Sequence, residues 1–269
     1  MVSELYKRMN YLLDIPYVTS SFITEYDLSK ANISALKYAG YLSDDDYSFL
    51  YNANKLYREI YIGNLEKRDK NLTKIKQHGI EEARRLFFEA NKLQDHEVLS
   101  IKNDAIFVIG TKQLQTQFGI FDFKRKNVYS FFMSTKNRLE IYYYYDPVGG
   151  NEIFDVKGIN DSVLHVHQDY MISFLCQIFY MLQTTTIDDT IRFYNEFYEN
   201  FINRRLDVGY YREFNAISKF RVISKFNDFG FDYPDASYLP MFNLDCNIQL
   251  LRDVYSVLAD IYFKSVNNQ

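Results

Sequence analysis

The stretch "VLSIKNDAIFVIG", residues 98–110, decides the fold prediction, because two short apolar runs flank a polar tripeptide. Runs of Val, Ile, Leu and Phe that are bounded by turn-forming residues are typical of β-strands, and Lys102-Asn103-Asp104 suits a tight hairpin. The sequence therefore predicts an antiparallel hairpin with Asp104 at its tip. An unpaired carboxylate beside a sheet interior costs free energy, so Asp104 calls for a compensating partner.

A second β-prone segment lies about seventy residues earlier in the chain. Residues 20–27, "SSFITEYD", end in Asp27, and a helical block separates this segment from the hairpin. Two carboxylates on neighbouring strands of one sheet can hold Mg²⁺ (or Mn²⁺), hard cations that share oxygen ligands with substrate phosphates. Asp27 and Asp104 are therefore our candidate catalytic and metal-binding residues.

The helical block contains clear start and stop signals. Gly40 ends a helix that begins near residue 30, and Ser43 is the expected N-cap of the next, with Asp44 to Asp46 at the positive end of its dipole. Residues 70–93 predict one helix or a broken pair, with Gly79 as the weak point.

The rest of the chain first continues as strands and then becomes helical, which predicts the α+β class. Residues 3–13 predict a short N-terminal helix that Pro16 ends or follows. β-prone runs occur at 115–123, 127–134, 139–146 and 152–158, and helical patterns at 162–183, 187–206 and 247–263.

Composition excludes some classes of protein. The net charge of −4 gives no global attraction to nucleic acid, so phosphate contacts must come from local basic patches. Cys176 and Cys246 match no zinc-binding spacing, and we expect reduced core thiols in a cytoplasmic protein. The longest apolar stretch, residues 170–182, is too short to span a bilayer.

The segment "EYDLSKANI", residues 25–33, resembles the first palm motif of template-dependent DNA polymerases. In that motif a strand ends in a metal-binding Asp, here Asp27, and runs into a helix. Families A and B have a steric gate against ribonucleotides five places further on, where this chain has Asn32. The usual Ser-Leu-Tyr of family B is replaced by Lys30-Ala31-Asn32.

The segment "EVLSIKNDAIFVI", residues 97–109, is similar to the acidic palm hairpin of family B. Asp104 occupies the place of the metal-binding second acid, and Lys102 stands where the first would be. The family A pattern is His-Asp-Glu, of which Asn103-Asp104-Ala105 keeps only the Asp. Residues 80–97 resemble the helix that leads into this hairpin in family B. The "FDVKGI" of residues 154–159 resembles the passage from palm to thumb in the same family.

The resemblance implies a diverged, bacteriophage-type polymerase palm with an antiparallel sheet and packed helices in residues 1–160. A helical thumb-like lobe would follow in residues 161–269. The implied activity is two-metal nucleotidyl transfer by one piece of a split viral DNA polymerase. Its partners would be a DNA primer-template, a nucleoside triphosphate and other chains of a replication or transcription complex in the host cytoplasm.

The resemblance implies nucleotide binding by Asn32, and location alone adds Arg58, Lys67 and Arg68. We expect nucleic-acid binding by Lys124, Arg125, Lys126 and Lys157. The basic stretch around Lys67 is equally well explained as a solvated helix face paired with acidic neighbours.

Each acidic candidate also has a structural alternative. Asp27 would serve as a helix N-cap, a role that Ser29 could share, and Asp104 as a turn residue. The rival function is a non-catalytic subunit or interaction protein that retains a degenerate palm scaffold. A nuclease would need a denser acidic cluster than the sequence shows.

Overall fold

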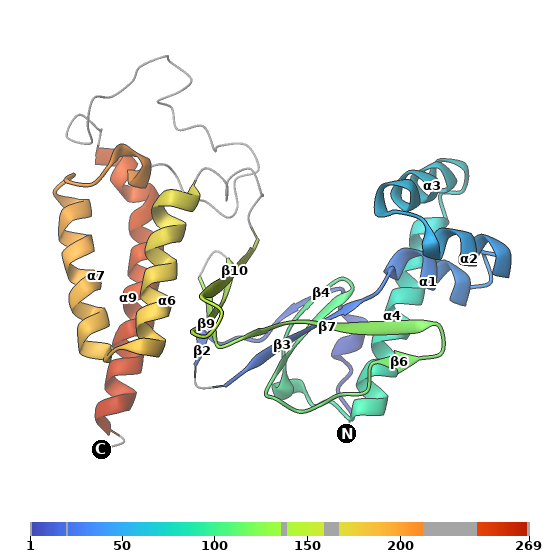
Figure 1. Ribbon diagram of the computed structural model, residues 1–269, viewed down its shortest axis with the longest axis horizontal. Coiled ribbons are helices and arrows are strands. Elements are labelled where there is room, and N and C mark those ends of the chain that lie inside the picture. Colours follow the sequence, from blue (N-terminus) through green and yellow to red (C-terminus); the bar gives the residue numbers. More distant parts are fainter. Residues whose placement is uncertain (1, 20, 136–138, 159–166, 212–240, 268–269) are drawn as a thin grey trace, which may run out of the picture. The chain divides into compact units, whose positions relative to one another are not determined.

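The computed structural model describes residues 2–19, 21–135, 139–158, 167–211 and 241–267, with the side chains of 241–246 left out. The chain forms an α+β fold of two compact units (Figure 1). Unit 1 comprises residues 1–14 and 21–128, and unit 2 comprises residues 15–20 and 129–269. Because each unit has its own sheet and its own core, we describe them separately.

Unit 1 is built on a six-stranded sheet with the order β1-β4-β5-β3-β7-β6. The pairs β1/β4, β4/β5, β5/β3 and β7/β6 are antiparallel. The predicted strand near residues 20–27 and the predicted hairpin are both confirmed, and they lie next to each other in this sheet. The strands are β1 (Asn10–Leu12), β3 (Ile23–Leu28), β4 (Val98–Lys102), β5 (Ala105–Ile109), β6 (Gln117–Phe118) and β7 (Phe121–Tyr129).

The predicted N-terminal helix over residues 3–13 is wrong. A single 3-10 turn, Leu5–Lys7, precedes β1, which pairs with β4 in the register Tyr11↔Ile101. Backbone pairing to an available sheet edge outweighs the weak helical preference of so short a segment.

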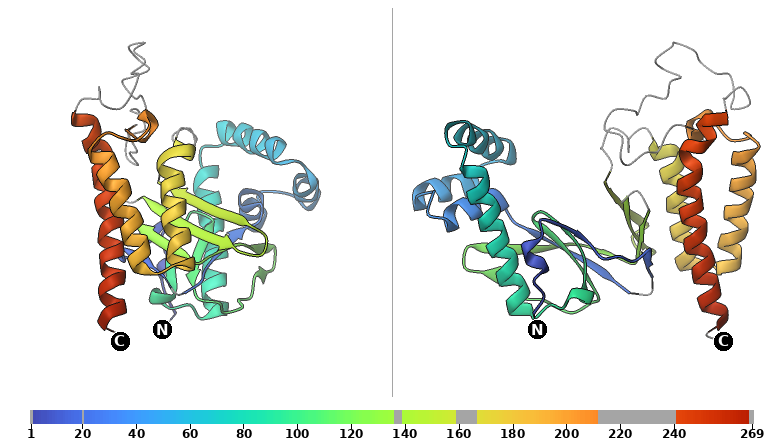
Figure 2. Two further views of the ribbon diagram at one scale, coloured as in Figure 1. Left: turned by 60° about the vertical axis from the view of Figure 1, so that its left-hand side comes forward. Right: turned by 180° about the vertical axis from the view of Figure 1, so that it is seen from behind.

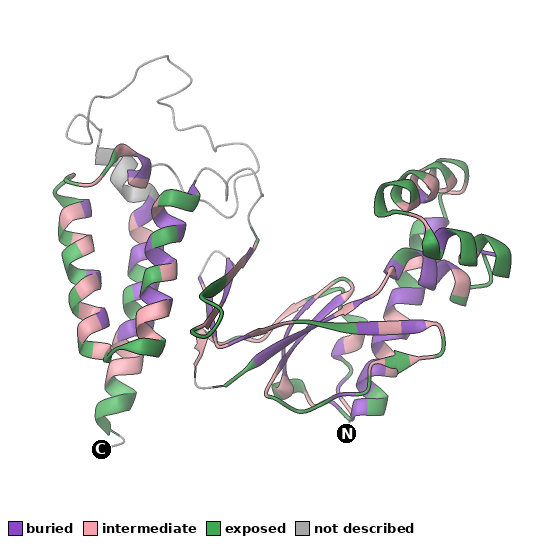
Figure 3. Ribbon diagram, in the orientation of Figure 1, coloured by how far each residue is buried: buried purple, intermediate pink, exposed green. Residues whose placement is uncertain are grey.

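Four helices separate β3 from β4: α1 (Ala31–Tyr38), α2 (Asp44–Asn52), α3 (Lys55–Arg68) and α4 (Leu72–Asn91). Ser43 caps α2 as predicted, since its side chain accepts a hydrogen bond from the Asp46 amide at 3.0 Å. Gly40 follows α1 with φ +72°, a left-handed conformation that suits glycine. The outer surfaces of α2 and α3 are largely exposed (Figure 3).

Helix α4 runs unbroken through Gly79, where the sequence left a broken pair open. A Cβ at Gly79 would lie 2.6 Å from the Ala35 Cβ, so the glycine permits close packing of α4 against α1. On its buried face, Phe87 packs on Tyr26 of β3 and Phe123 of β7, with ring centroids 5.3 and 4.7 Å away. Helix α4 therefore covers one face of the sheet and packs against β3 through this face (Figure 2).

Unit 2 contains a four-stranded antiparallel sheet with the order β10-β9-β8-β2. Its long hairpin β9–β10 turns at Gly150, whose amide donates to the Asp146 carbonyl at 2.8 Å. This turn agrees with the predicted one at Pro147–Gly150. The strands are β2 (Tyr17–Val18), β8 (Phe131–Ser134), β9 (Glu140–Asp146) and β10 (Asn151–Lys157).

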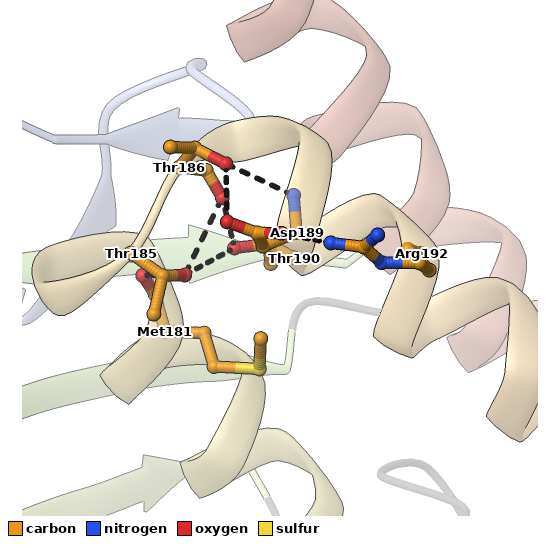
Figure 4. Close-up of polar contacts among 6 residues, drawn as sticks. All are labelled: Met181, Thr185, Thr186, Asp189, Thr190 and Arg192. Atoms are coloured by element: carbon orange, nitrogen blue, oxygen red, sulfur yellow. Dashed lines mark hydrogen bonds and ion pairs between the residues drawn. The ribbon is translucent and has the colours of Figure 1, made fainter.

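The helices of unit 2 are α6 (Ser173–Thr184), α7 (Ile187–Ile202) and α9 (Met241–Asn267), and they lie side by side in all views (Figures 1 and 2). A short π-helical turn, Gln168–Ile172, leads into α6, and a 3-10 turn, Val208–Tyr211, follows α7. Helix α7 begins at the N-cap Thr186, which accepts from the Asp189 amide and donates to its carboxylate (Figure 4).

The core of unit 2 joins its sheet to its helices through aromatic packing. Phe131 of β8 stacks on Phe179 of α6 with ring centroids 4.4 Å apart, and Tyr143 of β9 contacts the same ring. The sequence places a boundary at residue 160, whereas the compact units divide at residue 128, because β8 to β10 pack on these helices. Among the described residues, no helix is long and apolar enough to cross a membrane.

Candidate functional site

Asp27 and Asp104 are brought together by the pairing of β3 with β5. Asp27 is the register partner of Ala105, the residue directly after Asp104. The Leu28 amide donates to the Asp104 carbonyl oxygen at 3.0 Å, so the two carboxylate-bearing segments are joined by a direct backbone hydrogen bond. The end of β3 and the hairpin tip thus meet on neighbouring central strands of the sheet, as the sequence predicts.

The hairpin turn is held from behind by α4. Asn103 adopts φ +50°, a left-handed conformation that asparagine tolerates in two-residue turns. Its amide donates to the Met9 carbonyl at 2.7 Å. The buried Arg84 guanidinium donates through Nε to the Tyr6 carbonyl at 2.8 Å and through Nη1 to the Asn103 carbonyl. These bonds fix the position of the Asp104 backbone.

Both carboxylates line a cavity of about 400 Å³ in unit 1. Its walls come from the end of β3, the start of α1, one side of α3, the hairpin tip and β7, so it combines anionic and cationic side chains. The lining residues are Asp27, Leu28, Lys30, Ala31, Asn32, Ile33, Lys55, Arg58, Glu59, Ile62, Asp104 and Lys126.

The two acids repel each other across this cavity. Burial raises the pKa of Asp104 above its ordinary value, and the negative charge of Asp27 raises it further, against the smaller opposing effects of Lys126 and Arg84. A cation between the two carboxylates would offset both the burial and the repulsion.

Two further cations, Lys30 and Arg58, line the same cavity. Lys30 precedes α1 with φ +51° and lies over the Tyr51 ring, with its Nζ 3.2 Å from the ring centroid. Burial lowers the pKa of Lys30, and the positive charges of Arg58 and Lys124 lower it further. Arg58 donates to the Ala53 carbonyl and borders the same cavity. Two cations that border one cavity are suited to a polyanionic ligand.

Lys126 is the cation nearest the acids. Its Nζ lies 3.0 Å from Asp27 Oδ2 and 4.0 Å from Glu25 Oε1. Glu25 is buried two residues before Asp27 on β3 and also accepts a hydrogen bond from Asn127 Nδ2 at 3.1 Å. This part of the site is therefore charge-compensated by the protein itself.

The donor set is compatible with a divalent cation that shares its coordination with substrate. Two carboxylates beside an open cavity are the type of oxygen ligand that Mg²⁺ uses together with phosphates and water. Within the described residues, no group of three His, Cys, Asp or Glu side chains could enclose a metal ion. Asp27 and Asp104 would hold the cation, and the remaining ligands would come from substrate.

The structure distributes the predicted basic residues over several places. Asn32, Arg58 and Lys126 line the cavity, whereas Lys67 and Arg68 lie exposed in the last turn of α3. Lys124 and Arg125 are exposed on β7. Lys157 belongs to unit 2, where its Nζ lies 2.6 Å from Asp155 Oδ2.

The alternative roles of the two acids have different outcomes. The N-cap position of α1 is taken by Lys30, so Asp27 is not its cap. Asp104 is a turn residue and a cavity residue at once. The basic stretch around Lys67 was also explained as a solvated helix face with acidic partners. One such pair is present, since Glu66 Oε1 lies 2.5 Å from Lys76 Nζ.

Four charged residues near the site were absent from the predicted set: Glu25, Lys30, Lys55 and Glu59. The signal for Glu25 was its place two residues before Asp27, which puts both side chains on one face of the strand. Lys30 stood inside the quoted motif, but its approach to the cavity depends on a left-handed backbone that the sequence does not reveal.

Comparison with known proteins identifies one relationship. A family model described as "Bacteriophage PBS1 gene 130 protein" matches residues 1–247, most of the chain. No curated protein matches the sequence.

Proposed function

The chain belongs to the bacteriophage PBS1 gene 130 protein family, and we propose that it is a palm-type nucleotidyltransferase component of a phage polymerase. The observation that carries the proposal is the register of β3 and β5, with Asp27 opposite Ala105. It brings Asp27 and Asp104 to one cavity that also contains Lys30 and Arg58. The polymerase motifs that the sequence resembles place their two acids in the same order.

The proposed reaction is transfer of a nucleotide from a nucleoside triphosphate to a primer 3′-hydroxyl. The hydroxyl oxygen forms a bond to the α-phosphorus, its proton leaves, and the bond from that phosphorus to the bridging oxygen breaks to release pyrophosphate. Bound Mg²⁺ (or Mn²⁺) would activate the attacking oxygen and neutralise charge on the leaving one.

The residues of the chain divide the remaining work. Asp27 and Asp104 hold the cation, and Arg58 and Lys30 attract the triphosphate through charge-assisted hydrogen bonds. Asn32 lines the cavity at the motif position of the steric gate, and we expect it to lie beside the sugar of the incoming nucleotide. The exposed Lys124 and Arg125 on β7 are available for the phosphate backbone of a primer-template.

Other protein chains would complete the enzyme. The proposed assembly is a split polymerase in which this chain supplies the palm and a helical lobe, acting within a phage replication or transcription complex. The acidic net charge of −4 supports reliance on partner chains for much of the nucleic-acid contact.

The alternative is a non-catalytic subunit that retains the palm scaffold. The observation in its favour is that Lys126 is already paired with Asp27, with its Nζ 3.0 Å from Asp27 Oδ2. A structural subunit would keep this ion pair permanently.

Primer extension separates the two functions. The wild-type chain, with any partner chains that copurify from infected cells, is assayed with Mg²⁺ and all four dNTPs, alongside Asp104→Asn. The matched control is Asp122→Asn, which changes a half-buried acid on β7. We expect the wild type and the control to extend the primer and Asp104→Asn to lose at least about 100-fold in rate. An inactive wild type, or a fully active Asp104→Asn, contradicts the catalytic proposal.

A further inference from the structure

Lys126 of β7 extends its amino group towards the candidate metal-binding residue Asp27 on the neighbouring strand β3. It lies 3.0 Å from Asp27 Oδ2 and 4.0 Å from Glu25 Oε1. Lys126 also lines the cavity together with Asp104. A single ammonium on β7 therefore lies near three carboxylates, Glu25 and Asp27 of β3 and Asp104 at the β4–β5 tip.

The surrounding charges hold this ammonium in its protonated form. Partial burial is the largest single effect and lowers the pKa of Lys126, but the hydrogen bond to Asp27 and the charges of Asp27, Glu25 and Asp104 together outweigh it, so the pKa is raised. Lys30, Lys55 and Arg58 lie on the other walls of the cavity and would not attract it.

The side chain is also able to leave. The Lys126 side chain is 52 % exposed, and its four-carbon stem is flexible. Ion pairs that are open to solvent in this way contribute little to stability. A divalent cation carries twice the charge and accepts both carboxylates as ligands, so it competes effectively for Asp27.

We propose that Lys126 is a built-in counter-ion of the Asp27–Asp104 site, which a divalent cation must displace from Asp27 in order to bind. The inference rests on the proposed function, because it assigns the metal to the same two carboxylates. The displaced ammonium remains on the cavity wall, where it faces the polyanionic substrate that arrives with the metal. Binding of the metal therefore frees the Lys126 ammonium to contact phosphate, so the two events are coupled.

A titration of Mn²⁺ alone, read by the electron paramagnetic resonance signal of the free ion, tests this exchange without any activity assay. The full chain is compared with Lys126→Met, which keeps the stem and removes the charge. The matched control is Lys124→Met, two residues away on the same strand and exposed like Lys126. Asp27→Asn in both backgrounds shows whether the bound Mn²⁺ is at this site.

We expect Lys126→Met to bind Mn²⁺ roughly threefold to tenfold more tightly than the wild type. Lys124→Met should change the affinity less than twofold, and Asp27→Asn should abolish the site in both backgrounds. If Lys126→Met binds Mn²⁺ equally or more weakly while Asp27→Asn still abolishes binding, the counter-ion role is refuted and the proposed function stands. If neither the wild type nor Lys126→Met binds Mn²⁺, both proposals fall.

A second measurement is made on the wild-type sequence, and a conservative variant serves only to assign the signal. Lysine amines are dimethylated with ¹³C, and the Lys126 signal is assigned as the one lost in Lys126→Arg. Added Mg²⁺, which is diamagnetic, should shift this signal as the amine leaves Asp27, and the Lys124 signal should move much less. An unchanged Lys126 signal at saturating Mg²⁺ would refute the exchange.

Discussion

The Arg84 guanidinium donates hydrogen bonds to the carbonyl oxygens of Asn103 and Tyr6, and so links α4, the hairpin tip and the N-terminal segment. Arg84 is only 2 % exposed, which is unusual for an arginine. Both of its acceptors are backbone groups of segments that flank the site. Arg84 is therefore a positioning residue for Asp104, although it lies outside the cavity lining.

Replacing Arg84 by Met should reduce the free energy of unfolding of unit 1 by about 2–4 kcal/mol, because two acceptors lose a charged donor. Urea denaturation measures the loss. The matched control is Arg85→Met on the same helix, whose ion pairs with Glu82 and Glu89 are at the surface and should be worth less than about 1 kcal/mol. Equal effects of the two substitutions would show that Arg84 has no special role in the turn.

Gly79→Ala should destabilise unit 1 by roughly 2 kcal/mol or more, although alanine is the better helix former. The added Cβ would lie 2.6 Å from the Ala35 Cβ and 2.8 Å from its backbone oxygen, and neither atom belongs to a flexible side chain. Thermal unfolding followed by circular dichroism measures the effect.

Gly63→Ala is the matched control for this prediction. Gly63 lies inside α3, and an added Cβ meets nothing within 4 Å. The substitution should stabilise the protein by up to about 1 kcal/mol through helix propensity alone. A stabilising Gly79→Ala would contradict the close packing of α1 on α4.

Much of unit 1 was predictable because its signals are local. The polar tip of the hairpin, the strand that ends in Asp27 and the Ser43 cap each depend on a few neighbouring residues, and the structure confirms them. The pairing of β3 with β5 is non-local, but the order of the two acids in the resembling motifs indicated it. The N-terminal segment was mispredicted because its strand exists only through pairing with β4.

The charge arrangement of the site was less accessible from sequence. Lys124, Arg125 and Lys126 read as one basic cluster, yet only Lys126 reaches Asp27. Alternation along β7 separates Arg125 from its neighbours, and the register between β7 and β3 selects Lys126 over Lys124. That register depends on the whole sheet, so no local pattern revealed which lysine would compensate the acids.

Cys176 should be nearly unreactive towards Ellman's reagent at pH 8. Burial raises the pKa of its thiol to about 12, and the charge of Glu152 adds to the effect. The thiolate is the reactive form, and at pH 8 its fraction would be about 10⁻⁴. The test uses Cys246→Ser, so that Cys176 is the remaining cysteine of the sequence.

The rate of this reaction should rise about tenfold per pH unit between pH 8 and pH 10, while the fold is intact. Because the folded-state pKa lies above the unfolded value, the associated stability is complete below about pH 8.5 and is lost as the pH rises towards 12. Rapid labelling of the native protein at pH 8, at the rate seen in urea, would contradict the half-buried, apolar environment of Cys176.

Arg58→Gln should weaken the binding of inorganic triphosphate by roughly tenfold, because Arg58 lines the cavity beside Asp27 and Lys30. Isothermal titration calorimetry in the presence of Mg²⁺ measures this affinity. Arg68→Gln is the matched control, since Arg68 lies on the same helix and carries the same charge but is exposed in its last turn. It should change the affinity less than twofold. Equal weakening by both substitutions would mean that the triphosphate responds to the overall charge of α3 and not to the cavity, and the assignment of Arg58 to the nucleotide site would be withdrawn.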